Sequence, residues 1–171
     1  MKFSKILIIK LFFIFISSQL LFNVSKANAA EEIKIIYSIF SRTIKVNSLK
    51  TFAQEGNSTK KLKRILKATG STDKEIRSVL NKNFEIPISI ASKLVYSEIG
   101  NVFLTRLSSI IHPPRADDER TGMLALRASV IQGIKIGNGK INMINFFEGY
   151  PTKTIILDVN ALSKVMNKVE S

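Results

Sequence analysis

The stretch TGMLALRASVIQGIKIGNG, Thr121–Gly139, decides the fold of this chain. Its large apolar residues recur on nearly every side of a helical projection, and a helix that is apolar all round is buried all round. Gly137 and Gly139 end the pattern, because glycine is common just past a helix C-terminus. The spacing therefore predicts a central helix that the rest of the fold surrounds.

Arg127 is the only charged residue between Thr121 and Ile134. A guanidinium inside a buried helix is costly unless it is hydrogen-bonded and paired. We therefore expect Arg127 to be a structural buried charge. Three acidic residues are candidate partners: Glu98, Glu148 and Asp158. The alternative is that Arg127 binds a substrate, because buried charges also occur in active sites.

Three runs rich in β-branched and aromatic residues predict strands. IKIIYSIF (Ile33–Phe40) and TIKV (Thr43–Val46) lie on either side of Ser41-Arg42 and are expected to form a hairpin. TKTIILDV (Thr152–Val159) is a late strand that is expected to pair with the hairpin. Together these strands predict a small antiparallel β-sheet.

Capping residues and apolar periodicity predict the other helices. Their expected positions are a helix capped by Asn47 or Ser48 and ended by Gly56, one from Ser58 to Gly70, one with Thr72 and Glu75 at the spacing of a capping box, one that begins at Pro87, a longer one after Ser97, a short one over Ile141–Tyr150, and a last one capped by Asn160. The longer helix has its apolar face marked by Ile99, Val102, Phe103, Leu107, Ile110 and Ile111. The fold class is therefore mostly α (α+β), a compact helical domain with a small sheet.

The N-terminus has the three parts of a secretory signal peptide. Lys2 and Lys5 are basic, the residues from Ile6 to Phe22 are mostly apolar, and Ala27-Asn28-Ala29 is a small-x-small cleavage site. We expect residues 1–29 to be the signal peptide and residues 30–171 to be a single exported domain, in the periplasm, the cell envelope or the thylakoid lumen. The alternative is an uncleaved anchor helix, because the apolar run approaches the length of a membrane span.

The chain carries a formal net charge of +13 and contains no cysteine, so packing without disulfides must hold the fold. For an exported protein, anionic lipid head groups or acidic protein surfaces are the expected partners of positive charge, and nucleic acid is not. One predicted helix has a basic face that could contact an anionic surface, made of Lys60, Lys63, Arg64 and Lys67. The plainer interpretation is that the charge keeps the protein soluble.

The sequence lacks the residues of most catalytic and metal sites. There is no cysteine, His112 is the only histidine, and neither a phosphate-binding glycine loop nor a G-x-S-x-G motif occurs. The segment His112–Gly122 has two prolines and mixed charges, which predicts the main exposed loop. Within it, Asp117-Asp118-Glu119 lacks the alternating spacing of a calcium loop. We therefore predict no catalytic, cofactor-binding or metal-binding residue.

Four segments carry a resemblance to a known family: SLKTFAQEG (Ser48–Gly56), LVYSEIG (Leu94–Gly100), GMLALRASVIQG (Gly122–Gly133) and FFEGYPTKTIILD (Phe146–Asp158). In this order they resemble a cyanobacterial domain of unknown function that usually lies N-terminal to a secreted α/β-hydrolase domain. The hydrolase domain with its serine nucleophile is expected to be missing here, so its activity is carried to no residue of this chain.

The resemblance implies an exported, non-catalytic accessory or binding domain without a cofactor. Its expected partner is an exported α/β-hydrolase in trans, or a lipid-like ligand of such an enzyme. Two alternatives stay open. The chain is an esterase-like or lipase-like hydrolase in its own right, or it is a basic protein bound to a membrane surface.

Overall fold

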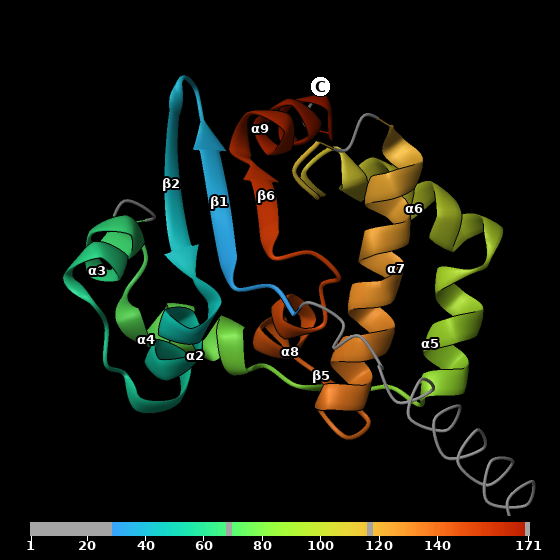
Figure 1. Ribbon diagram of the computed structural model, residues 1–171, viewed down its shortest axis with the longest axis horizontal. Helices are drawn as coiled ribbons and strands as arrows, with labels where there is room; N and C mark the ends of the chain where they lie inside the picture. Colours follow the sequence, from blue (N-terminus) through green and yellow to red (C-terminus); the bar gives the residue numbers. More distant parts are fainter. Residues whose placement is uncertain (1–28, 68–69, 116–117, 170–171) are drawn as a thin grey trace, which may run out of the picture.

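The structure is a computed structural model that describes residues 29–67, 70–115 and 118–169. The predicted signal peptide lies outside these residues, except for Ala29. Along the chain the elements are β1 (Glu32–Tyr37), β2 (Phe40–Lys45), α2 (Val46–Glu55), α3 (Lys60–Lys67), α4 (Asp73–Asn81), β3 (Phe84–Glu85), α5 (Ile88–Val95), α6 (Glu98–Ser108), β4 (Ile111–His112), α7 (Glu119–Ile136), β5 (Lys140–Ile141), α8 (Met143–Glu148), β6 (Thr154–Asp158) and α9 (Val159–Val169). This mostly helical α+β fold confirms the predicted fold class (Figure 1).

The main sheet is mixed, with strand order β2-β1-β6-β4, whereas the sequence predicted an antiparallel one. The β1–β2 hairpin is antiparallel, but β6 pairs parallel to β1, with Ile33 opposite Ile155. The helices between β2 and β6 return the chain to the end of the sheet at which β1 begins. There the Glu31 amide donates to the Lys153 carbonyl oxygen at 2.8 Å. β2 also ends there, so β6 is parallel to β1 because it lies beside β1 and not beside β2, and the strand sequence alone does not specify that neighbour.

The hairpin turns at Ser38-Ile39 and not at the expected Ser41-Arg42. Tyr37 and Phe40 are the last paired residues, so the loop has two residues. One common type of two-residue hairpin loop requires a positive φ at its first central position. Ser38 occupies that position and has a φ of 52°. The turn is also held from outside, because the Ser38 amide donates to Asn160 Oδ1 at 2.8 Å.

Helix α7 lies between α8 on one side and α5 and α6 on the other, and it packs against all three (Figure 1). The prediction of a central helix is confirmed, and Leu126 and Ile134 are buried. Burial on all sides is wrong, because Leu124 and Ile136 are exposed. Leu124 lies in the second turn of α7 and Ile136 is its last residue, so the exposed positions are not on one strip of the helix.

The core is one cluster that joins the sheet to α2, α7 and α8. Its most buried large side chains are Phe52, Leu126, Tyr150 and Ile155, each with no exposed surface. Glycines let α8 approach α7 closely. A Cβ added at Gly149 would lie 2.6 Å from the Gly133 nitrogen and 2.7 Å from the Ser129 carbonyl oxygen.

Several predicted helix ends are confirmed. Gly56 ends α2 in the left-handed conformation, with a φ of 82°. Thr72 and Glu75 form the expected capping box at the start of α4. Pro87 precedes α5, and the Ser97 side chain caps α6.

Three predicted caps are wrong by one or two residues. Helix α2 follows Lys45 without a side-chain cap, because it begins directly at the end of strand β2. In α3 it is the Thr59 hydroxyl, not that of Ser58, that accepts from the Leu62 amide. Asp158 accepts hydrogen bonds from the first amides of α9. The Asn160 side chain instead accepts a hydrogen bond from the Ser38 amide in the hairpin turn.

The predicted loop at His112–Gly122 is shorter than expected. His112 pairs with Ile156 in β4, and Glu119 already begins α7. β4 is an edge strand, so no described strand pairs with its outer side. The proline that follows β4 therefore breaks no hydrogen bond between strands on that side. A second small sheet of β3 and β5 was not predicted, because two-residue strands carry too little pattern.

Candidate functional site

His112 is half-buried in β4. Its Nδ1 lies 2.9 Å from the Pro113 carbonyl oxygen, so this nitrogen donates to the backbone when it carries the proton. Within the described residues no hydrogen bond or ion pair joins His112 to a carboxylate. Its contacts are those of a strand residue.

Asp118 and Glu119 are the described members of the acidic trio, and the Asp118 carboxylate is hydrogen-bonded to the backbone. This carboxylate accepts from the Thr121 amide at 2.6 Å and caps α7. Hydrogen bonding to the side chain and to the amide of Thr121 lowers the pKa of Asp118. Asp117 lies outside the described residues. The described part of the chain has no cluster of three or more residues of the histidine, aspartate or glutamate type that could hold a metal ion.

Tyr150 is a buried polar group in the core. Its hydroxyl has no hydrogen-bond partner among the described residues, and burial raises the pKa of this phenol. Its ring meets Phe146 edge to face, with 6.5 Å between the ring centroids. Since no described carboxylate or cation is hydrogen-bonded to the hydroxyl, Tyr150 acts here as a large apolar core residue.

Arg127 is 9% exposed and joins α7 to the corner between α5 and α6. Its Nε donates to the Val95 carbonyl oxygen at 2.8 Å, and Nη2 donates to Asn101 Oδ1. The guanidinium also lies over the Tyr96 ring, with its carbon 4.7 Å from the ring centroid. All three partners belong to the end of α5 or the start of α6.

The expectation that a carboxylate pairs with Arg127 is wrong within the described residues. Glu148 forms an ion pair with Lys50 at 2.7 Å, Asp158 caps α9, and Glu98 is exposed in the first turn of α6. The carbonyl of Val95 replaces the carboxylate, because the last carbonyls of a helix are unpaired and carry the negative end of its dipole. The structural role of Arg127 stays a prediction.

The apolar face predicted for this helix is divided: Leu107 and Ile111 pack against the core and Ile110 is buried, whereas the other three residues are exposed on the outer face of α6. Ile99 is 80% exposed and Phe103 is 62% exposed, and Val102 lies between them. The residues that α6 buries in its helical turns are Gly100, Leu104 and Ser108. Small side chains decide this orientation: Ser108 packs on Gly122 of α7 so closely that a Cβ there would be 2.7 Å away.

Helix α5 extends the same kind of surface. Its Ile90 and Leu94 side chains are exposed, as is Tyr96 at the corner. On α6 a shallow hollow is lined by Glu98, Ile99, Val102, Phe103 and Arg106. We call six of the exposed apolar residues of α5, α6 and the corner between them the α5–α6 face: Ile90, Leu94, Tyr96, Ile99, Val102 and Phe103. Adjacent large apolar side chains rimmed by charge mark interaction sites, so this face is the candidate functional site.

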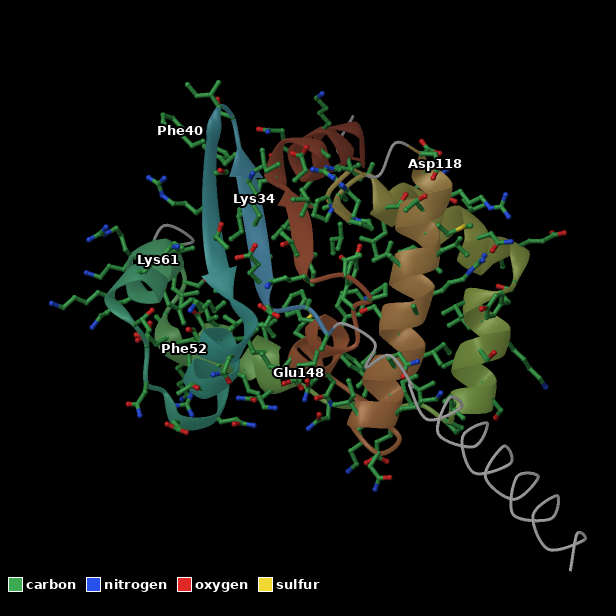
Figure 2. The ribbon with its side chains drawn as sticks, in the orientation of Figure 1. Lys34, Phe40, Phe52, Lys61, Asp118 and Glu148 are labelled. Atoms are coloured by element: carbon green, nitrogen blue, oxygen red, sulfur yellow. The ribbon has the colours of Figure 1, made fainter. Side chains whose placement is uncertain are left out.

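The basic residues predicted to contact an anionic surface gather on one side of α3. Lys60, Lys63, Arg64 and Lys67 are all exposed, and none forms an ion pair within the described residues. Figure 2 shows nitrogen-tipped side chains leaving α3 on the side turned away from the rest of the fold, with Lys61 labelled. The structure therefore brings these residues together.

No helix of the described residues is both long and apolar enough to cross a membrane. Comparison with curated proteins finds no match, and comparison with solved structures finds none either. Residues 29–158, from the start of the described residues to the end of β6, match the family described as alpha/beta hydrolase of unknown function (DUF1400). The chain belongs to this family of alpha/beta hydrolases of unknown function.

Proposed function

We propose that this protein is an exported, non-catalytic accessory domain that binds a separate α/β-hydrolase through the α5–α6 face. The observation that carries the proposal is the exposure of six large apolar side chains on two consecutive helices and the corner between them. Water-exposed apolar surface of this kind is favourable to bury against a partner.

The family description supports the choice of a hydrolase as the proposed partner. The description is that of a hydrolase, yet the sequence contains no G-x-S-x-G motif and only one histidine. That histidine is a strand residue bonded to the backbone beside it. A domain with this family relationship and without its own nucleophile elbow is suited to act beside an enzyme that has one.

Arg127 holds the α5–α6 face in a fixed arrangement before a partner binds. Its hydrogen bonds to Val95 and Asn101 hold the corner between α5 and α6 on α7. A surface that is rigid before binding loses less conformational freedom on association, which favours affinity.

The test is a tagged protein purified from its own host under mild detergent, with bound proteins identified by mass spectrometry. We expect a stoichiometric α/β-hydrolase with the wild-type chain. The double variant Ile99→Gln/Phe103→Gln should recover at least about tenfold less of it, since each lost apolar contact weakens binding. Neither side chain is in the core, so folding should be unaffected.

The matched control is Ile39→Gln/Phe40→Gln. It makes the same pair of replacements at side chains that are 89% and 60% exposed, on the β1–β2 turn. This control should retain the hydrolase. Equal recovery with both double variants, or recovery of lipid without any hydrolase, would contradict the proposal.

A further inference from the structure

We infer that a second surface of this protein docks on an anionic lipid bilayer. It consists of the tip of the β1–β2 hairpin, Tyr37, Ile39 and Phe40, together with the basic side of α3. In Figure 1 this surface lies on the side of the molecule opposite α5 and α6. The inference therefore does not depend on the proposed function.

The charge of α3 is unusually uniform. Its eight residues, KKLKRILK, include five basic ones and no acid. Leu62 and Leu66 are buried, so the helix is fixed to the core by its apolar side and presents the basic side chains outward as a group. Within the described residues none of the five forms an ion pair, so their charge is free to act on a negatively charged surface.

Helix α3 lacks side chains that could enter a membrane, because its leucines face the core. The hairpin tip supplies them. Tyr37, Ile39 and Phe40 are 62%, 89% and 60% exposed. An aromatic pair beside an isoleucine is the kind of group that inserts at the boundary between head groups and acyl chains.

The register of the hairpin indicates that the tip and α3 form one continuous surface along strand β2. Phe40, Arg42 and Ile44 alternate onto one face of β2, and Ile44 is the buried one. Around Ile44, a hollow is lined from both elements, by Thr43 and Lys45 of β2 and by Lys61, Leu62 and Ile65 of α3. The tip thus continues beyond this hollow along β2, with the exposed Arg42 between the tip and the hollow.

The tip is also held in position. Tyr37 and Phe40 face each other across the last pair of the ladder. The Ser38 amide between them donates to Asn160 Oδ1 of α9 at 2.8 Å. An exposed apolar turn that is fixed in this way needs no reorganisation to insert.

A lipid surface fits these features better than a nucleic acid or an acidic protein does. Four of the five basic residues of α3 are lysines, which act as point charges and suit a diffuse negative field. The apolar tip gains most from an apolar phase into which all three side chains can enter.

The test is sedimentation of the full chain with vesicles of phosphatidylcholine alone or with phosphatidylglycerol added. All variants keep residues 1–28, so any contribution of that segment is the same in each. We expect tighter binding to the anionic vesicles and loss of this excess at high salt. Replacing Lys60, Lys63, Arg64 and Lys67 by Gln should weaken anionic binding by about 100-fold or more.

The matched control replaces Lys74, Lys93, Arg106 and Lys135 by Gln. These are again three lysines and one arginine, all exposed, on α4, α5, α6 and α7. The control should lose far less affinity. An equal loss in both variants would show that net charge alone drives binding and would overturn the site, provided that circular dichroism shows both are folded.

The hairpin variant Ile39→Gln/Phe40→Gln separates insertion from charge. This variant should bind vesicles more weakly, and its binding should depend on salt as the binding of the wild type does. The variant Ile99→Gln/Phe103→Gln should bind vesicles like the wild type. Equal binding of the wild type to anionic and neutral vesicles would overturn the inference. So would binding to duplex DNA without binding to anionic vesicles.

Discussion

Arg127 of α7 donates from Nε to the carbonyl oxygen of Val95, the last residue of α5, over 2.8 Å. The same guanidinium donates to Asn101 and covers the Tyr96 ring. One side chain therefore connects the central helix to the corner from which the exposed α5–α6 face extends.

Arg127→Met should lower the free energy of unfolding by about 2–4 kcal/mol, because it leaves the Val95 carbonyl and the Asn101 side chain without their donor. Urea unfolding measures this loss. Arg127→Lys should recover little of it, since an ammonium does not reproduce the planar fork that reaches both acceptors. A variant with wild-type stability that no longer binds its partner would show that Arg127 is a binding residue instead.

Tyr150→Phe should raise the free energy of unfolding by about 1 kcal/mol. The change keeps the ring and removes a hydroxyl that has no partner among the described residues, and an unmet buried polar group is costly. Thermal and urea unfolding of both proteins check this. A loss of stability would mean that the hydroxyl makes a hydrogen bond.

The same pair of proteins should differ in alkali. Burial raises the pKa of Tyr150 in the folded state above its ordinary value of 10.0. The associated stability is complete below pH 10 and decreases as the pH rises above it, because the unfolded chain then releases a proton that the folded chain keeps. Tyr150→Phe should therefore lose less stability than the wild type between neutral and strongly alkaline pH.

Gly149→Ala should destabilise the protein by about 1–3 kcal/mol, the usual cost of overpacking. The added methyl group would meet backbone atoms of Gly133 and Ser129, which cannot rotate away. Gly149 has a φ of −80°, so the effect would be steric. Gly139→Ala is the comparison: its φ is +90° and its surroundings are open, so backbone strain of about 1 kcal/mol is expected.

The purified protein should not hydrolyse short-chain nitrophenyl esters above the buffer rate. Its one histidine contacts its own backbone neighbour, and no carboxylate orients it as a general base within the described residues. Ester cleavage that disappears in His112→Ala, while His112→Ala remains folded, would establish the alternative of an enzyme in its own right.

Much of the local structure follows from the sequence. The capping box of Thr72 and Glu75, the left-handed stop at Gly56 and the cap at Ser97 all form as expected. Each depends on hydrogen bonds within a few residues, so nearby residue types determine it. The late strand at Thr154–Asp158 is also local, since its β-branched run sets its conformation.

The candidate sites depend on distant contacts. Helix α6 has two strips that could be buried, and the close approach of Ser108 to Gly122 selects Leu104 for the core and leaves Phe103 in water. A carbonyl at the end of α5, not a carboxylate, became the partner of Arg127, because that acceptor exists only once α5 has formed beside α7. Periodicity records how apolar a strip is but not which element covers it.

The sequence by itself determined the helices, the three longer strands, the basic side of α3 and the central place of α7. Tertiary structure alone decided that β6 runs parallel to β1, that Arg127 braces a helix corner, and that an exposed aromatic turn continues the surface next to α3. The physical reason is the range of the forces involved. Capping and propensity act over a few residues, whereas packing and helix-end hydrogen bonds depend on which elements meet in space.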